Sequence, residues 1–464
     1  MDSRENAEVQ NPLGTAPIGK LIIRYTVPSV ISLVVSSLYN MIDQIFIGNG
    51  VGYLGNAATN VIMPLMTIMI ALGLLVGNGA ASYMSLQLGK GERESAARGV
   101  GNMIVLTAGI GIAALILSEI FLRPVCILFG GTDEVLEYAM DYGRIIVIGF
   151  PVSIIDGSFG NVIRADGRPK QNMIGMLIGC ITNMILDPIF IFVFHWGVKG
   201  AAFATIIGQA LNAVYYINCM FHFKTIRLAR DDFRLRKNTV TRILALGAAS
   251  FMTQISAVII QALENNLLVK YGDLSIYGGD ITLAAFGITY KTSHLIMNVA
   301  LGIATGIQPI LGYNYGSKQY DRVKKALKIG LISSIIVMFV GWIIFEFFPE
   351  PLILLFGENN DLYMEFAKKC FRIFMLCCTL IPFSLLIPNF FQSVGRPVLS
   401  TVLSLSRQIV ILIPAMLILT FIMGIDGVLW AGPIADTLAA IICVIVLRVY
   451  WNRIFEIKKG DKNG

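Results

Sequence analysis

Three pairs of polar residues interrupt long apolar stretches in the first half of the chain. They are Asn40 with Asp43, Asn183 with Asp187, and Thr205 with Gln209. Spacings of three or four residues put both members of a pair on one helical face. A charge at mid-membrane costs about 2.5–3.5 kcal/mol on insertion scales, so a retained charge has a partner or a role. Carboxylates, carboxamides and a hydroxyl of this kind can hold a proton or Na⁺.

Asp43 and Asp187 are the two ionisable members of this set. Two carboxylates in one desolvated pocket repel each other, which favours proton uptake near neutral pH. We hypothesise that protonation of this site is linked to rearrangement of the surrounding helices and to release of a cationic substrate. Na⁺ bound by Asp43, Asn183 and Asp187 is the alternative for the coupling ion. A purely structural alternative is that Asp187 satisfies backbone groups freed by Pro188.

Further polar residues fall in the apolar stretches of the second half. Asp436 occupies the position that corresponds to Gln209, so we expect Asn40, Gln209 and Asp436 to line a substrate cavity. Glu264 lies late in its stretch, and we expect it near the outer surface and solvated. The sequence leaves open the partners of Lys291, His294 and Arg407.

One acid and one base in the stretch at 138–160 have no obvious role. Asp156 and Arg144 could contribute to the cavity or neutralise each other. Their separation of twelve residues argues against direct contact on a single straight helix. Both roles therefore stay open at the level of sequence.

The elements that must position these residues are membrane-spanning helices. The chain is 56% hydrophobic and 14% charged, with a mean hydropathy of +0.73. A span needs about 20 apolar residues. Runs of that length occur near 21–47, 56–86, 100–122, 138–160, 172–194, 201–221, 243–269, 282–312, 327–348, 365–392, 398–422 and 428–450. The sequence therefore predicts an all-α polytopic membrane protein with twelve transmembrane helices, and prolines inside the runs predict bends.

The chain also contains an internal repeat at an offset of 227 residues. Ile127-Leu128-Phe129-Gly130 corresponds to Leu354-Leu355-Phe356-Gly357, and Gly197-Val198-Lys199-Gly200 to Gly424-Ile425-Asp426-Gly427. Near the acids the match shifts by one residue, so that Leu186-Asp187-Pro188 aligns with Leu412-Ile413-Pro414 and Asn183 with Ile409. The acid site is therefore confined to the first copy.

Six helices per copy give both copies the same orientation, so the repeats are parallel and are expected to surround a central cavity. We predict an N-terminal six-helix lobe at 1–221, a cytoplasmic linker at 222–242 and a C-terminal six-helix lobe at 243–464. A self-contained cavity of this kind needs only a monomer.

Charge predicts the orientation of the chain. Most of the 36 Lys and Arg fall in the tails and in alternate connections, which places both termini and the 222–242 linker in the cytoplasm. The net charge of +7 is thus a topology signal and does not indicate nucleic-acid binding. The first apolar run is too long for a signal-peptide core, so we expect no cleaved leader. The seven cysteines and three histidines show no metal-ligand spacing, and we expect no structural metal and no cofactor.

Several segments resemble the multidrug and toxic compound extrusion (MATE) family, in particular the MepA-like exporters of its DinF-like branch. The matching segments are Gly14 to Leu21, Tyr39 to Gly48, Arg164 to Pro169, Asn183 to Pro188 and Gln308 to Gly316. The resemblance implies a V-shaped antiporter in the bacterial cytoplasmic membrane that exports lipophilic or cationic compounds in exchange for H⁺ or Na⁺. It also implies that the cation site consists of Asp43, Asn183, Asp187 and Thr205, with Asn161 as a nearby candidate.

The sequence departs from the NorM-like pattern in one respect. The stretch at 365–392 has no Asp, which argues against a cation site in the second lobe.

The alternative within the same superfamily is a flippase of lipid-linked oligosaccharides, which would need a more cationic cavity for pyrophosphate. A major-facilitator carrier also has two six-helix halves, but its loop signatures are absent. An intramembrane enzyme would need a motif such as His-Glu-x-x-His, and we find none. A channel or scaffold would not explain paired acids in one repeat only.

Overall fold

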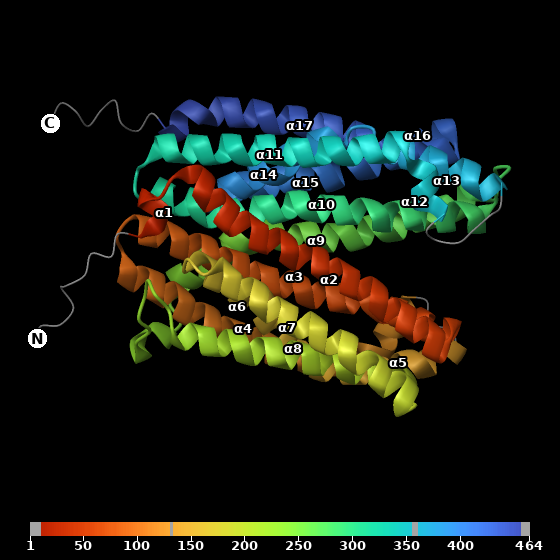
Figure 1. The fold of residues 1–464 in the computed structure, drawn as a ribbon, viewed down its shortest axis with the longest axis horizontal. Helices are drawn as coiled ribbons and strands as arrows, with labels where there is room; N and C mark the ends of the chain where they lie inside the picture. Colours follow the sequence, from red (N-terminus) through yellow and green to blue (C-terminus); the bar gives the residue numbers. More distant parts are fainter. Residues whose placement is uncertain (1–10, 130–132, 355–360, 456–464) are drawn as a thin grey trace, which may run out of the picture.

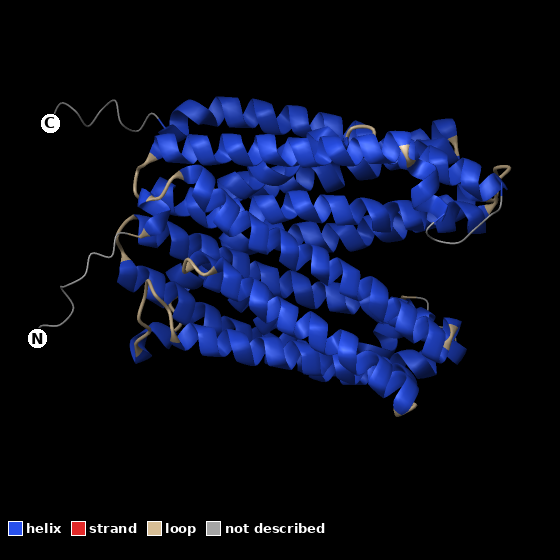
Figure 2. Cartoon of the chain, viewed as in Figure 1, coloured by secondary structure: helices blue, strands red, loops and turns tan. Residues whose placement is uncertain are grey.

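The computed structural model describes residues 11–129, 133–354 and 361–455, and this part of the chain consists of helices and short loops without a strand (Figure 2). The first half contains α1 (Pro12–Thr15), α2 (Ile18–Val51), α3 (Tyr53–Gly89), α4 (Arg93–Leu128), α5 (Asp133–Ile148), α6 (Phe150–Ala165), α7 (Pro169–Pro188), the π-helix η1 (Ile189–Val193) and α8 (Gly197–Phe221). The 3₁₀ turn η2 (Arg230–Phe233) lies in the linker.

The second half repeats this plan with more breaks. It contains α9 (Lys237–Gly272), α10 (Gly279–Gly316), α11 (Tyr320–Phe347), α12 (Pro349–Leu354), α13 (Asp361–Phe374), η3 (Cys378–Leu380), α14 (Ile381–Ser393), α15 (Pro397–Leu405), the π-helix η4 (Ser406–Leu412), α16 (Ile413–Met423) and α17 (Ile425–Phe455). Within the described residues, eleven helices are long and apolar enough to cross a membrane, and α5 with α6 forms one more span bent by 52°. The predicted all-α fold with twelve spans is therefore confirmed.

Proline positions explain most of the breaks. Pro151 is the second residue of α6, directly after the bend at Gly149, and Pro382 is the second residue of α14, after η3. Pro188 precedes η1, while Pro414 follows η4. A proline cannot donate its backbone hydrogen bond, so a neighbouring turn widens or breaks. The two π-helices therefore lie on opposite sides of the aligned prolines Pro188 and Pro414.

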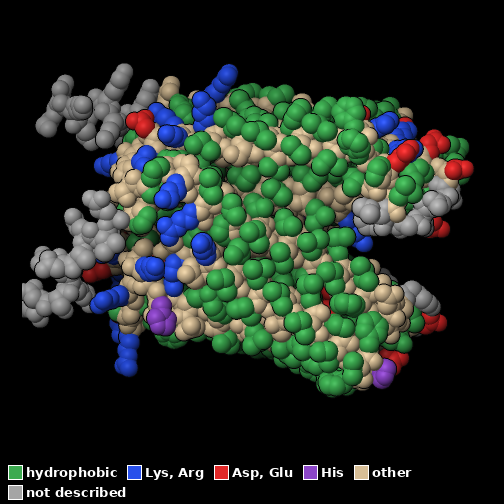
Figure 3. All heavy atoms as spheres, viewed as in Figure 1, with side chains coloured by type: hydrophobic (Ala, Val, Ile, Leu, Met, Phe, Trp, Pro, Cys, Tyr) green, Lys and Arg blue, Asp and Glu red, His purple; other side chains and the backbone are tan. Residues whose placement is uncertain are grey.

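The helices form two lobes that diverge toward one end of the molecule (Figure 1). Helix α1 and the last residues of α17 both lie at the opposite end of the molecule (Figure 1). That end also carries most of the visible Lys and Arg (Figure 3). We call this the basic end, and the other the open end. At the open end the surface is notched between the lobes, so the molecule has a cleft there (Figure 3).

Close backbone contacts join the lobes at the basic end. Gly89 of α3 faces Gly316 of α10, where a Cβ on Gly89 would lie only 3.0 Å from the Cα of Gly316. Two hydrogen bonds add to this contact, from Asn78 to Ser250 at 2.9 Å and from Gln308 to Ser82 at 2.8 Å. Because glycine has no side chain, it lets two backbones approach this closely. We call this set of contacts between α3 and α9/α10 the seal.

Helix α2 belongs to both lobes (Figure 1). Its first residues, Leu21 and Tyr25 among them, pack in a hydrophobic cluster with residues of the second repeat, whereas Ile47 packs in a cluster of the first. The start of the chain is fixed in the same way, since Arg322 donates to the carbonyls of Leu13 at 2.9 Å and Ala16 at 2.7 Å. The packing therefore divides the lobes within α2, although the repeat divides the sequence at the linker.

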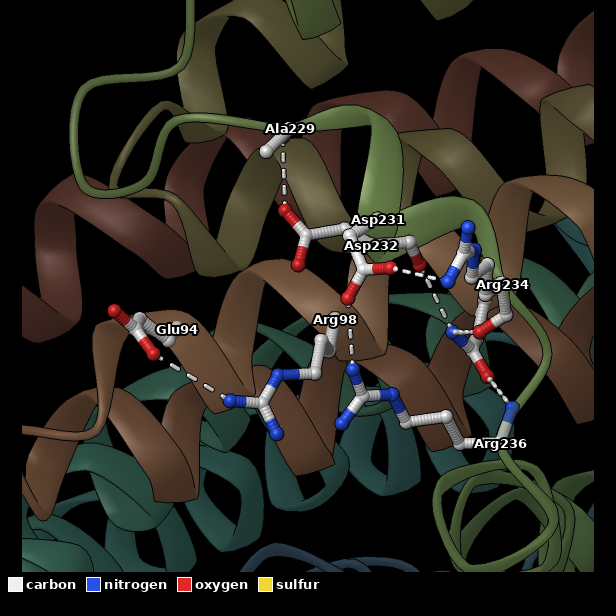
Figure 4. A network of polar contacts seen from close by, with 8 residues as sticks. Glu94, Arg98, Ala229, Asp231, Asp232, Arg234 and Arg236 are labelled. Carbon is white, nitrogen blue, oxygen red and sulfur yellow. Dashed lines mark hydrogen bonds and ion pairs between the residues drawn. The ribbon is translucent and has the colours of Figure 1, made fainter.

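The linker at 222–242 is fixed to the first lobe by buried polar groups. Asn102 of α4 is fully buried, donates to the carbonyls of Asp232 and Arg234 at 3.0 Å each, and accepts from the backbone N–H of Arg236 at 2.8 Å. Charged side chains surround this contact, with Arg236 and Arg234 both paired to Asp231 (Figure 4). The linker therefore moves with the first lobe.

A second anchor of the linker is Asp166, which lies between α6 and α7. Its carboxylate accepts from the backbone N–H groups of Lys224 and Thr225, from the Thr225 hydroxyl at 2.6 Å, and from Arg168 at 2.8 Å. Burial raises the pKa of the Asp166 carboxyl, and these donors oppose that shift.

Candidate functional site

The buried acids Asp43 and Asp187 lie together in the first lobe. Asp43 comes from α2 and is 9% exposed, and Asp187 ends α7 with no exposed surface. Their carboxyl groups are within hydrogen-bonding distance of each other. Residues 144 positions apart thus form one site because α2 packs along α7.

Asn183 and Thr205 complete this cluster. The Asn183 amide satisfies both its donor and its acceptor when its nitrogen faces Asp187, at 3.0 Å from Oδ2. Its oxygen then accepts from the hydroxyl of Thr205 at 3.2 Å and from the Thr205 backbone N–H at 3.3 Å. Asn183 lies one turn before Asp187 on the same face of α7, as the spacing predicts. We call Asp43, Asn183, Asp187 and Thr205 the acid cluster.

The electrostatics of the acid cluster favour one bound proton. Two unit charges about 4 Å apart repel by about 4 kcal/mol at an effective dielectric constant of 20. Oδ1 of Asp43 has no hydrogen-bond partner in the described structure, and no Lys or Arg there is ion-paired to either acid. A proton on one carboxyl removes the repulsion and supplies the donor that the pair needs.

Two tyrosines border the acid cluster, and the sequence pattern alone did not indicate either of them. Tyr39 of α2 and the buried Tyr142 of α5 are close enough to interact electrostatically with both Asp43 and Asp187. Tyr39 is one helical turn before Asp43, so its spacing was the available signal. Tyr142 carries no comparable pattern in the sequence.

Asn161 lies apart from the acid cluster. Its amide donates to the Gly157 carbonyl at 2.8 Å, and its oxygen accepts from Arg164 at 2.8 Å. None of its hydrogen bonds within the described chain links it to Asp43 or Asp187. The structure therefore places Asn161 as the partner of Arg164 on α6.

The three residues expected in a substrate cavity lie in different surroundings. Asn40 is exposed and donates to the Ser36 carbonyl of its own helix, whereas Asp43, three residues later, is buried. Gln209 accepts from Ser153 at 2.7 Å within the first lobe.

Asp436 lies in the second lobe and is neutralised by Arg407. The Nε and Nη2 atoms of Arg407 lie 2.7 and 2.6 Å from Oδ1 of Asp436. Asp436 is therefore the partner of Arg407, which the sequence left open. Asp436 is 3% exposed, so this ion pair is largely desolvated. Glu264 is near the same guanidinium and is 8% exposed, so the expectation that it is solvated at the outer surface is wrong. The His294 ring lies against the Tyr290 ring, with the two ring centres 4.4 Å apart and the planes tilted by 49°.

Within the described residues, no group of three or more His, Cys, Asp or Glu side chains is arranged to hold a metal ion. All seven cysteines are described and free, and six of them are buried. Small buried thiols of this kind serve as packing groups.

Taken with the acid cluster and the cleft, the two repeated lobes define a helical membrane transporter. The MatE family model matches residues 28–189 and 245–425, once in each repeat. The chain therefore belongs to the MATE family, whose members are transporters and not enzymes.

Relatives and solved structures agree with this assignment. The multidrug export protein MepA of Staphylococcus aureus (strain MSSA476) is 26% identical over 443 residues, covering 95% of each chain. MepA of Staphylococcus haemolyticus is 25% identical, covering 94% of this chain and 95% of its own. A structure described as an outward-facing multidrug resistance MATE family transporter has a TM-score of 0.89 at 23% identity, covering 96% of this chain and 98% of its own. A transporter from Pyrococcus furiosus has the same TM-score and coverage at 22% identity.

Proposed function

We propose that this chain is a proton-coupled antiporter that exports cationic, amphipathic compounds, with the acid cluster as its proton site. The observation that carries this proposal is the contact between two buried carboxyl groups, Asp43 and Asp187, without an ion-paired base in the described structure. The deprotonated pair attracts a cation, and a proton taken up by the pair removes that attraction. Proton uptake and substrate release are thereby linked.

The orientation follows from charge. The basic end carries the Lys and Arg that favour the cytoplasmic side, so the open end faces outward (Figure 3). In this state the cleft is open to the outside and the seal closes the cytoplasmic side. Protons from outside then enter the acid cluster as the substrate leaves, which gives export driven by the inward proton gradient. The chain works as a monomer in the bacterial cytoplasmic membrane, with both termini in the cytoplasm.

The test is efflux of a cationic dye, ethidium, from vesicles containing the purified full-length chain. A proton gradient and a sodium gradient are imposed in separate experiments. We expect the proton gradient to drive efflux, and Asp43→Asn and Asp187→Asn to lower it by about 5- to 150-fold, the range for typical coupling free energies of 1–3 kcal/mol. The matched control is Asp141→Asn, since Asp141 is half-exposed and paired with Lys199 in the first lobe. This control should transport normally.

Three outcomes contradict parts of the proposal. Full activity of both Asp43→Asn and Asp187→Asn, at equal amounts of protein, excludes the acid cluster as the coupling site. Efflux under a sodium gradient alone makes Na⁺ the coupling ion, with Asp43, Asn183 and Asp187 as its ligands. Dye movement under neither gradient excludes export coupled to H⁺ or Na⁺ and favours a lipid-linked oligosaccharide flippase.

A further inference from the structure

Buried polar groups continue from the acid cluster toward the basic end of the first lobe. On α8 they are Thr205, Asn212 and Tyr216, and the partly exposed Gln209 lies between them, with spacings of four, three and four residues. Such spacings keep all four on one helical face. On α7 the corresponding face carries Asn183, Cys180 and Asn172, and the Tyr216 hydroxyl donates to the Asn172 carbonyl at 2.8 Å. Asn172 is roughly 22 Å from Asp187 along α7.

Asp156 of α6 is the one carboxylate on this route between the acid cluster and Tyr216. Its side chain is within hydrogen-bonding distance of Asn212, and Asn212 is within the same distance of Tyr216. Oδ1 of Asp156 and Oδ1 of Asn212 are both enclosed, and neither has a hydrogen-bond partner in the described structure. An acceptor without a donor is costly when buried, so the unpaired Oδ1 of Asp156 indicates a place for a proton.

No positive charge compensates Asp156. The described chain gives it no ion pair, and Arg164, two turns further along α6, is bonded to Asn161. Among the described residues, the titratable groups of neighbouring helices that interact with Asp156 include Tyr39 from α2, Cys180 from α7 and Tyr216 from α8, which are neutral in their protonated forms.

Helices α3 and α4 contact this part of α6 through residues that do not titrate. Gly73 of α3 contacts Gly157, and Thr107 of α4 bonds Ser158 at 3.1 Å. A carboxylate enclosed by neutral groups in a membrane is stable only with a proton or another cation bound.

We propose that Asp156 is a second proton-holding carboxyl of the first lobe, which accepts the coupling proton from the Asp43 and Asp187 pair and passes it toward the basic end. The O–H bond of the donating carboxyl breaks, a new O–H bond forms on Asp156, and the negative charge moves to the donor. Tyr39 is close enough to interact electrostatically with all three carboxylates. This inference rests on the proposed proton coupling and adds a site to it.

The experiment separates proton-driven transport from substrate exchange in vesicles containing the full-length chain. Asp156→Asn keeps the size and hydrogen-bonding ability of the side chain but removes the exchangeable proton. We expect it to lower ethidium efflux driven by a proton gradient by about tenfold or more, a coupling free energy of at least about 1.4 kcal/mol. Exchange of labelled for unlabelled ethidium without a gradient should stay within about twofold of wild type, since exchange needs no net proton transfer.

Two further variants keep the outcome decisive. Ser158→Ala removes a buried polar group two residues away and should affect neither measurement. Asp156→Glu retains an ionisable carboxyl and should restore gradient-driven efflux in part. If Asp156→Asn supports gradient-driven efflux at the wild-type rate, Asp156 carries no coupling proton. If it abolishes exchange as well and Asp156→Glu behaves in the same way, the role of Asp156 is structural and the inference is wrong. Failure of the wild-type chain to respond to a proton gradient would instead refute the proposed function.

Discussion

Substitution of Gly247 by alanine tests whether the seal sets the conformation of the transporter. Gly247 of α9 packs against the backbone of α3, where a Cβ would lie 2.6 Å from the carbonyl carbon of Leu75 and 2.9 Å from its Cα. Ordinary contacts begin at 3.4 Å, so α3 and α9 would have to separate by roughly 0.8 Å or more. Backbone atoms cannot rotate away as a flexible side chain can. The strain therefore falls on the interface between the lobes.

The expected magnitude follows from the cost of overpacking. An extra methyl group in a well-packed contact costs about 1–3 kcal/mol. If that cost applies only to the sealed state, the ratio of sealed to unsealed molecules falls by roughly 5- to 150-fold. We therefore expect Gly247→Ala to open the seal at the basic end. The free energy of unfolding of each lobe by itself should change little, because Gly247 packs across the interface between the lobes.

The assay measures access to the seal from the basic end. Ser82 accepts a hydrogen bond from Gln308 across the lobes, so Ser82→Cys places a thiol in the seal. The protein is treated with a water-soluble maleimide, and the modified peptide that contains position 82 is quantified by mass spectrometry. Gly247→Ala should increase the rate of modification. The control is Gly287→Ala on α10, where an added Cβ meets no atom within 4 Å. Equal modification rates for wild type, Gly247→Ala and Gly287→Ala would refute the argument that this contact holds the seal closed.

Two other predictions concern buried polar contacts outside the acid cluster. Arg407→Ala leaves the 3%-exposed Asp436 without its partner and should destabilise the second lobe by roughly 3 kcal/mol, measured as a lower melting temperature in detergent. Replacement of both residues by leucine should recover most of that loss. Asn102→Ala removes three hydrogen bonds to the linker and should cost about 1–3 kcal/mol, measured as faster proteolysis between Arg227 and Lys237. Asn218→Ala, at an exposed position on α8, should leave linker proteolysis unchanged. A melting temperature of Arg407→Ala at or above that of the leucine pair, or a resistant linker in Asn102→Ala, would contradict them.

Hydropathy and the internal repeat were sufficient to predict the helices and their two-lobe arrangement. Long apolar runs identify spans directly, because a bilayer requires them. The acid cluster was also predictable, since Asp43, Asn183 and Asp187 stand out as polar residues in apolar surroundings and one copy of the repeat lacks them. The sequence alone did not determine whether Asp43 and Asp187 lie in contact, because their contact depends on how α2 packs against α7.

The prediction that failed concerns which face of a helix is buried. Glu264 lies late in its apolar run, but it is buried. Apolar residues face lipid as readily as protein, so the usual contrast between polar and apolar faces is weak in a membrane. The pairing of Arg407 with Asp436 joins two helices and has no local spacing that would reveal it. The role of Asp156 required the packing of α2, α7 and α8 around α6.

The position of α2 connects the acid cluster with the contacts at the basic end. In its first half, Thr26 and Val30 pack against Gly306 and Gly302 of the second lobe, where a Cβ on either glycine would lie within 3.0 Å of them. In its second half, Asp43 meets the first lobe, roughly 25 Å from Thr26 along the helix axis. Glycine contacts this close tolerate little sliding, so a rotation or shift of α2 at Asp43 changes the packing between the lobes. Proton occupancy at Asp43 can therefore alter the stability of the interlobe contacts through one continuous helix, without a separate signalling element.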